Sequence, residues 1–200
     1  MNEKINIGEI IKVGLILFAI TAISAALLAF VNSKTAPLIA ENDIIKEQTA
    51  LKTVMPDAAD FKQEEITSDL EALTDGKGEI NKIYTALDGT GNAIGACVIT
   101  ETSGYDIGIQ TVTGVDKDLK ITGIDIISMN ETPGLGAKAN NDDFKAQYAG
   151  KSYEVGVSKT SATDTDIQAI SGATKTSNGV TNGVNIALQV AEKILEGGDK

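Results

Sequence analysis

The sequence predicts an α+β protein: a single N-terminal transmembrane helix followed by an antiparallel-sheet domain with a C-terminal helix. Three observations support this class: an uncharged apolar run at residues 13–31, strand-like segments across 80–128, and a final segment that is apolar at helical spacing. We therefore divide the chain into a short flank (1–12), a transmembrane helix (13–31), a linker and helix (32–78) and one folded domain (79–200).

The run from Val13 to Val31 is expected to cross a membrane and to remain attached. At about 1.5 Å per residue, a helix of this length nearly spans a hydrocarbon core of about 30 Å. The alternative is a cleaved signal peptide, whose apolar region is shorter, about 7–15 residues, and ends in a small-residue cleavage site that this run lacks. Lys12 and Lys34 flank the run, and the lysines on its two sides give little indication of orientation.

A second helix is predicted after the membrane run. Pro37 suits the first turn of a helix, and residues 38–55 continue in a helical pattern that Pro56 ends. Residues 57–78 are polar and acidic and show no periodic pattern, so we assign them no element.

Two hairpins are predicted between residues 80 and 128. Each has an Asp at the start of its turn, and the spacing from Asp88 to Gly95 equals that from Asp116 to Gly123. This suggests two similar hairpins in one antiparallel sheet, arising by internal repetition or by coincidence among common turn residues. The four predicted strands are Ile80–Leu87, Ala93–Thr100, Asp106–Val115 and Lys120–Ser128.

The C-terminal third is predicted to end in a long amphipathic helix. Before it we expect a short helix at Asp142–Tyr148, a strand at Tyr153–Val157 and a loop at 159–170. The final helix should run to about Glu196, because Gly197-Gly198 stops it. Its apolar face consists of Val180, Val184, Ala187, Leu188, Ala191 and Leu195.

Composition excludes several functions. The net charge of −11 argues against a nucleic-acid partner, which requires a basic face. The chain has no His, the commonest metal ligand and general base, so we expect no metal site and no catalytic His. Cys97 is the single cysteine and lies in a predicted strand, so we expect a small core residue rather than a disulfide.

The segment Ser171–Ser177, which reads Ser-Gly-Ala-Thr-Lys-Thr-Ser, immediately precedes the final helix. A helix N-terminus offers unpaired N–H groups and a partial positive charge, which suit a phosphate. The small residues let an anion approach the backbone, and Thr174 adds a hydroxyl. The plain alternative is a Ser/Thr-rich helix cap without a ligand. Lys175 and Lys159 are available to balance an anion, although both also suit a solvated surface.

This string resembles the flavinylation motif of the covalent FMN-binding domain, which occurs in the G subunit of Rnf complexes and the C subunit of sodium-pumping NADH:quinone reductases. The resemblance implies that FMN is joined through its phosphate to Thr174 by a separate flavin transferase that uses FAD as donor. The family usually has Asp three residues before the Ser, where this chain has Gln168. The other implied cofactor-binding residues of the string are Ser171, Gly172, Ala173, Thr176 and Ser177.

A second match lies upstream, at residues 130–136. Its Thr-Pro-Gly is a turn that also suits an ordinary strand-to-helix connection. The segment resembles the Glu-Thr-Pro-Gly-Leu-Gly loop of the same family, which packs against the flavin ring. The resemblance implies that Glu131, Thr132 and Leu135 bind the cofactor, with Leu135 on the ring. Gly104-Tyr105 also has a near match in the family, and we expect Tyr105 in the core, with contact to the flavin ring as the alternative.

The resemblance covers nearly the whole chain and implies an electron-transfer subunit of a membrane-bound, ion-translocating ferredoxin:NAD oxidoreductase, the Rnf complex. It implies integral-membrane and iron–sulfur subunits, a flavin transferase and membrane lipid as partners. It places the FMN-binding domain (79–200) outside the cytoplasm, on the cell membrane. Flavin supplies the redox chemistry, so no catalytic residue is expected. The alternatives are the C subunit of the quinone reductase, and a membrane-tethered extracytoplasmic binding module without flavin.

Overall fold

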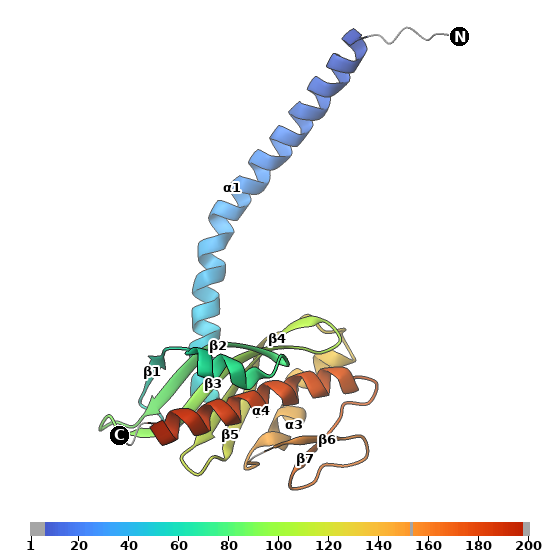
Figure 1. Ribbon diagram of the computed structural model, residues 1–200. Coiled ribbons are helices and arrows are strands. Elements are labelled where there is room, and N and C mark those ends of the chain that lie inside the picture. The colour runs from blue at the N-terminus through green and yellow to red at the C-terminus, as the bar shows by residue number, and fades with distance from the viewer. Residues whose placement is uncertain (1–6, 153, 198–200) are drawn as a thin grey trace. The chain divides into compact units, whose positions relative to one another are not determined.

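A computed structural model of the chain describes residues 7–152 and 154–197 (Figure 1). It divides into two compact units, Met1–Ile45 and Lys46–Lys200, which are described separately. The described residues of the first unit, 7–45, are helical, and the second unit holds the sheet and every cavity discussed below.

Helix α1, Ile7–Val54, is continuous, so the predicted break before residue 38 is wrong. Pro37 lies inside α1, where its missing N–H removes one helical hydrogen bond. The hydroxyls of Ser33 and Thr35 bond back to the carbonyls of Phe30 and Val31, at 2.7 and 3.1 Å, and do not cap a new helix. An 18-residue stretch of α1 has a mean hydropathy of 2.5 and no buried residue, so the helix is long and apolar enough to cross a membrane.

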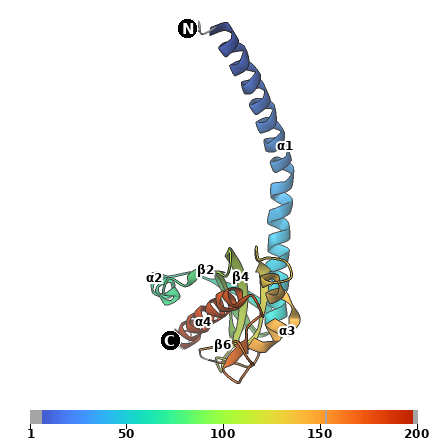
Figure 2. The same ribbon diagram turned by 90° about the vertical axis from the view of Figure 1, so that its right-hand side faces the viewer.

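The second unit is built on one antiparallel sheet whose strands are neighbours in chain order, β1-β2-β3-β4-β5 (Figures 1 and 2). The four predicted strands are confirmed, with ends shifted by a few residues. The fifth strand, β1, lies in the segment that received no assignment. The strands are β1 (Asp60–Glu64), β2 (Gly78–Leu87), β3 (Ala93–Ser103), β4 (Ile107–Asp116) and β5 (Ile121–Ser128).

The two predicted hairpins share one turn geometry. In each turn the carboxylate of the opening residue, Asp88 or Asp116, accepts the backbone N–H groups two and four residues later at 2.8–2.9 Å. The residue three positions after each Asp has a positive φ, 86° at Gly91 and 57° at Leu119. The equal spacing seen in the sequence therefore corresponds to two equivalent turns.

The sheet lies between helix α4, Thr174–Gly197, and the last turns of α1 (Figure 2). Alternate side chains of β3 serve the two layers: Val98 packs with α4, whereas Cys97 packs with the end of α1. Two glycines bring α4 very close to β3. A Cβ on Gly179 would lie 2.6 Å from the Ser103 carbonyl oxygen, so only glycine fits there.

Short elements connect β5 to α4, and two further short helices connect β1 to β2. The predicted helix at 142–148 is confirmed as α3 (Asp142–Lys145) continued by the 3-10 helix η3 (Ala146–Tyr148). The predicted strand at 153–157 appears as β6, which begins three residues later and ends one residue later, and Tyr153 lies outside the described residues. The predicted loop at 159–170 contains strand β7, parallel to β6. The other elements are α2 (Ser68–Glu71), η1 (Ala72–Thr74), η2 (Gly136–Asn140), β6 (Gly156–Ser158) and β7 (Asp166–Gln168).

Candidate functional site

A cavity of about 540 Å³ lies at the N-terminal end of α4 and joins the two sequence motifs. It receives residues from three places: the β3–β4 turn, the loop after β5, and the start of α4. Segments far apart in the chain therefore meet at one site. Its lining residues are Tyr105, Glu131, Thr132, Leu135, Gly136, Gly172, Ala173, Thr174, Lys175 and Thr176.

The start of α4 presents Thr174 to this cavity. Helix α4 begins at Thr174, which is half-buried, and Gly172 before it has a φ of +79°, a conformation suited to glycine. Buried Ser177 holds the turn in place: its hydroxyl accepts the N–H of Ile170 at 3.0 Å and donates to the carbonyl of Ala173 at 3.1 Å. Ser171 is exposed and does not line the cavity.

The carboxylate of Glu131 links the three parts of the site. The side chain is 8% exposed. Its Oε1 accepts the backbone N–H groups of Tyr105 and Asp106, at 2.9 and 3.2 Å, and its Oε2 accepts the hydroxyl of Thr176 at 2.8 Å. These hydrogen bonds hold the β3–β4 turn and the first turn of α4 to the loop after β5.

Leu135 and Thr132 lie on the outer side of the same loop. The Thr132 carbonyl accepts the N–H groups of Leu135 and Ala137, at 3.1 and 3.2 Å, which closes the turn. Leu135 is 46% exposed, and its Cδ2 reaches within 3.4 Å of the position that a Cβ on Gly172 would occupy. The apolar tip of the loop therefore contacts the turn that precedes Thr174.

Comparisons with known proteins identify the family of this chain. The family described as FMN-binding domain matches residues 104–189, which include every cavity-lining residue, and the RnfG N-terminal region matches residues 1–54. The G subunit of the Na(+)-translocating ferredoxin:NAD(+) oxidoreductase complex of Acetobacterium woodii is 39% identical over 96% of this chain and 98% of its own length. The chain belongs to the RnfG family.

Two further relatives in this family have related names. The G subunit of the ion-translocating oxidoreductase complex of Methanosarcina acetivorans is 32% identical over 90% of this chain and 93% of its own. The G subunit of the proton-translocating ferredoxin:NAD(+) oxidoreductase complex of Clostridium ljungdahlii is 31% identical over 84% of this chain and 83% of its own. The fold is also that of the crystal structure of Shewanella oneidensis NqrC, with a TM-score of 0.51, 18% identity, and 72% of this chain and 74% of that chain covered.

In this RnfG family member, Tyr105 corrects a prediction made from the sequence. We expected it in the core, but it is 77% exposed and lines the cavity, with its ring centroid 5.9 Å from the Lys175 Nζ. The reason is local: Gly104 and Asp106 close a tight turn by an N–H to carbonyl bond of 2.9 Å, and Glu131 binds the N–H of Tyr105. The side chain therefore projects outward. In the sequence, the position of Tyr105 between two predicted strands already indicated a turn residue.

Two residues near the motif do not line the cavity. Gln168 lies in β7, where its N–H donates to the Gln147 Oε1 at 2.7 Å and its side-chain amide donates to the Thr160 carbonyl at 3.1 Å. Lys159 is exposed at the start of the loop between β6 and β7 and does not line the cavity. Lys175 is the lysine that reaches the cavity. Gln168, which stands where the family usually has Asp, is therefore not part of the cavity lining.

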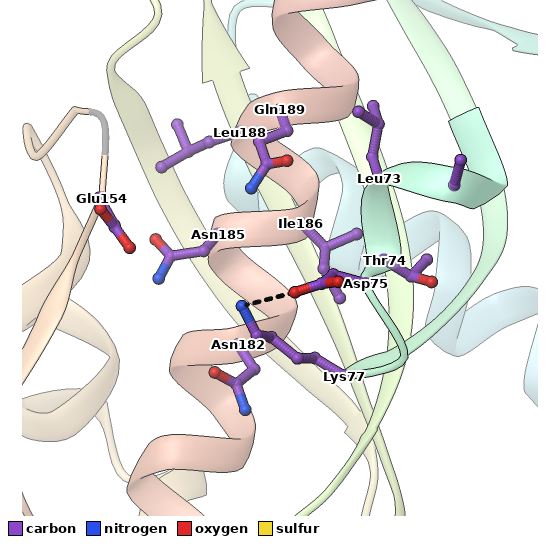
Figure 3. Close-up of a pocket in the computed structure, with 11 residues that line it drawn as sticks. Leu73, Thr74, Asp75, Lys77, Glu154, Asn182, Asn185, Ile186, Leu188 and Gln189 are labelled. Carbon is purple, nitrogen blue, oxygen red and sulfur yellow. Dashed lines mark ion pairs between the residues drawn. The ribbon is translucent and has the colours of Figure 1, made fainter. Parts of the chain in front are cut away.

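A second, more polar cavity of about 350 Å³ lies along the outer side of α4 (Figure 3). Its amide side chains come from α4, and Asn185 bonds both the N–H and the carbonyl of Val155 at 2.9 Å. An exposed ion pair joins Lys77 to Asp75 at 3.4 Å on the opposite wall. No residue of the two motifs lines this cavity.

The other candidate groups that the sequence raises are metal-ligating side chains and the single cysteine. Among residues 7–152 and 154–197, no group of three or more His, Cys, Asp or Glu side chains is arranged to hold a metal ion. Cys97 is fully buried, as expected for a core residue, and burial raises the pKa of its thiol to about 12.

Proposed function

We propose that this chain is the electron-transfer subunit of a membrane-bound, ion-translocating ferredoxin:NAD oxidoreductase of the Rnf type, and that it carries electrons on FMN joined through a phosphoester to Thr174. The observation that carries the proposal is the position of the Thr174 side chain, at the first residue of α4 and in the cavity that both family motifs line. The match to an FMN-binding domain supports the cofactor, and the relatives support the complex.

The cavity suits FMN in size and chemistry. Its volume of about 540 Å³ is in the range of ordinary cofactor sites, about 300–1,000 Å³. The first N–H groups of a helix have no partner within the helix and attract an anion, so the start of α4 suits a phosphate. Leu135 and Tyr105 supply exposed apolar surface for a planar ring system. Lys175 contributes a positive charge beside the helix start.

Each lining residue then has a distinct role. Thr174 holds the phosphate through its side-chain oxygen, Leu135 and Tyr105 shield the ring from water, and Thr132 lies at a polar edge. FMN, when bound, accepts and releases electrons, so the protein itself requires no catalytic acid or base. Ser171, Gly172 and Ala173 form the turn through which the backbone approaches the phosphate, and Ser177 keeps that turn closed.

The covalent bond requires a flavin transferase and FAD. The Thr174 hydroxyl oxygen forms a bond to the FMN phosphorus of FAD, and the pyrophosphate P–O bond breaks. AMP leaves with the bridging oxygen, and the hydroxyl proton passes to a base of the transferase or to water. No oxidant or reductant takes part. Thr174 is half-buried and Gly172 is exposed, which supports access by such an enzyme to the folded chain.

We further propose that α1 anchors the domain in the cell membrane and places it outside the cytoplasm. The partners are then the integral-membrane and iron–sulfur subunits of the complex, together with lipid around α1. The N-terminal match to the RnfG region and the apolar stretch of α1 support the anchor. A reporter enzyme fused after Lys200 tests the side: activity only outside the cytoplasm is expected, and activity inside would overturn the orientation.

The C subunit of the sodium-pumping quinone reductase is the second candidate. The likeness to NqrC, at 18% identity, concerns the fold alone, whereas three relatives that match most of this chain are G subunits of Rnf-type complexes. A flavin-free binding module remains as a third candidate. Detection of covalent flavin in the experiment below would exclude that module.

The test is covalent loading of the full chain produced together with a flavin transferase. We expect a fluorescent band on a denaturing gel, and a mass increase of one FMN less one water. Thr174→Ala should abolish both, and Thr160→Ala, an exposed threonine outside the cavity, should leave both unchanged. Full loading of Thr174→Ala would reject the attachment site, and an unmodified parent chain would reject the cofactor assignment.

A further inference from the structure

The carboxylate of Glu131 fits closely between two glycines, Gly104 and Gly136. Neighbouring backbone makes room for it at two points: a Cβ on Gly104 would clash with Oε1, and a Cβ on Gly136 would clash with Oε2. Both oxygens accept hydrogen bonds from the protein, from Tyr105, Asp106 and Thr176. Hydrogen bonds to an ionised acceptor are stronger than those between neutral groups, so this contact is among the firmer ones at the site.

The bonded groups belong to the two parts that must keep a fixed spacing. Thr176 lies two residues after Thr174 on the same helix. Tyr105 is an exposed ring that lines the cavity from the β3–β4 turn. The sequence separations are 45 residues from Glu131 to Thr176 and 26 residues from Glu131 to Tyr105. The Glu131 side chain therefore bridges the first turn of α4 and the β3–β4 turn that carries Tyr105.

We propose that Glu131 is a positioning residue rather than a direct ligand of the flavin. Its hydrogen bonds to Tyr105, Asp106 and Thr176, together called the clasp, fix the start of α4 relative to the ring of Tyr105. The inference rests on the proposed function. It predicts that loss of the clasp leaves Thr174 able to accept FMN but lets the ring environment vary.

The clasp is tested from both sides. Glu131→Gln keeps the shape and can still accept the two backbone N–H groups, but it replaces the charged Oε2 with a donor facing the Thr176 hydroxyl. Thr176→Val removes that hydroxyl at similar volume, and Thr176→Ser restores it. Glu101→Gln is the matched control, because Glu101 is a half-buried carboxylate on β3 that accepts amides of Asn81 and Gln110 and does not line the cavity.

The first measurement needs no flavin. In the full chain without FMN, hydrogen–deuterium exchange of the peptide covering residues 104–106 should be roughly tenfold faster in Glu131→Ala, as expected for loss of a net hydrogen bond. Glu131→Gln and Thr176→Val should give smaller increases in the same direction, which keeps the test decisive if Glu131→Ala does not fold. Thr176→Ser and Glu101→Gln should match the parent chain.

The second measurement uses the FMN-loaded chain. Glu131→Gln and Thr176→Val should load FMN, with a shifted midpoint potential and a shifted flavin absorption band, while Thr176→Ser and Glu101→Gln retain the parent values. Unchanged exchange in all variants overturns the clasp. If Glu131→Gln and Thr176→Val lower the melting temperature but leave the midpoint potential and the flavin spectrum unchanged, Glu131 only stabilises the fold. That result overturns the positioning role. If the parent chain takes up no FMN, the proposed function fails, and the exchange measurement still decides whether the clasp exists.

Discussion

The two faces of the sheet receive their helices in opposite ways. On the α4 face the small residues belong to the helix: Gly179 and Gly183 lie where a Cβ would come within 2.6 Å of β3 atoms. On the α1 face the small residue belongs to the strands: a Cβ on Gly114 would lie 2.7 Å from the carbonyl oxygen of Val54. In each interface one of the two elements has glycine at the contact, so both helices pack closely against the sheet.

The difference matters because of where each contact lies. Gly179 is in the same helix as Thr174 and little more than one turn away. Its contact with β3 therefore also sets how far Thr174 lies from the sheet. Gly114 lies near the Asp116 turn, at the opposite end of its strand from the β3–β4 turn that carries Tyr105. Packing on the α4 face should therefore affect the flavin, and packing on the α1 face should affect only stability.

The largest expected effect separates these two roles. Gly179→Ala and Gly114→Ala should each lower the free energy of unfolding by about 1–3 kcal/mol, because the added methyl group meets backbone that cannot move aside easily. Only Gly179→Ala should also reduce covalent FMN loading or shift the flavin spectrum. Denaturant unfolding and gel fluorescence measure the two effects.

Gly123→Ala is the control for this pair, because a Cβ there meets its nearest atom, the Cα of Val54, at an ordinary 3.7 Å. It should change the free energy of unfolding by less than about 0.5 kcal/mol. Equal loss of flavin in Gly179→Ala and Gly114→Ala would show that the two faces do not differ in the way argued.

A second prediction concerns the polar part of the α1 face. Near the start of the second unit, the carboxylate of Glu47 accepts the Lys82 ammonium at 2.7 and 2.9 Å and the Tyr84 hydroxyl. Burial, and then the hydrogen bond and charge of Glu47, raise the pKa of Tyr84 above its ordinary value. Glu47→Ala should lower the free energy of unfolding by about 1–3 kcal/mol, because two donors lose their acceptor.

The same residues predict a pH dependence. Because the folded state holds Tyr84 protonated more tightly than the unfolded state, its contribution is complete below about pH 10 and is lost as pH rises further. Tyr84→Phe should therefore flatten part of the alkaline loss of stability. Part of that loss should remain, because burial also raises the pKa of Tyr148. Flavin loading at neutral pH should be unaffected by either Glu47→Ala or Tyr84→Phe, and a loss of loading would contradict the separation of the faces.

The sequence predicted the regular parts of this fold for physical reasons that also explain its misses. The four predicted strands are rich in apolar residues between turn signals, α4 is apolar at helical spacing, and all five were found. Strand β1 was missed because its only apolar side chain, Phe61, is half-buried at the sheet edge, so no alternation shows. The predicted helix break is wrong because Pro37 lies in an exposed part of α1, where one lost hydrogen bond does not end the helix.

The candidate site was predicted in its motifs but not in its connections. Resemblance to a family brought the two loops together, and the structure places residues of both around one cavity. The bonds of Glu131 join residues 26 and 45 positions apart, and no local pattern reports contacts over such separations. Tyr105 was placed in the core because an aromatic residue beside a strand usually packs inward, whereas here a bonded turn directs it out.

The smallest expected effect lies within the α4 face itself. Three buried threonine hydroxyls of the described chain, those of Thr100, Thr111 and Thr113, have no hydrogen-bond partner, whereas the buried hydroxyl of Thr102 donates to the Gly179 carbonyl at 2.9 Å. Burying a hydroxyl without a partner is unfavourable, so Thr113→Val should be neutral or should raise the free energy of unfolding by up to about 1 kcal/mol. Thr102→Val removes a made bond, so it should lower the free energy of unfolding by about 1 kcal/mol. The two changes are chemically identical and lie on neighbouring strands, so chemical unfolding of the pair isolates the value of that single bond between β3 and α4. If Thr113→Val proves as destabilising as Thr102→Val, the close approach of α4 depends on the shape of the threonine side chains rather than on the hydrogen bond to Gly179.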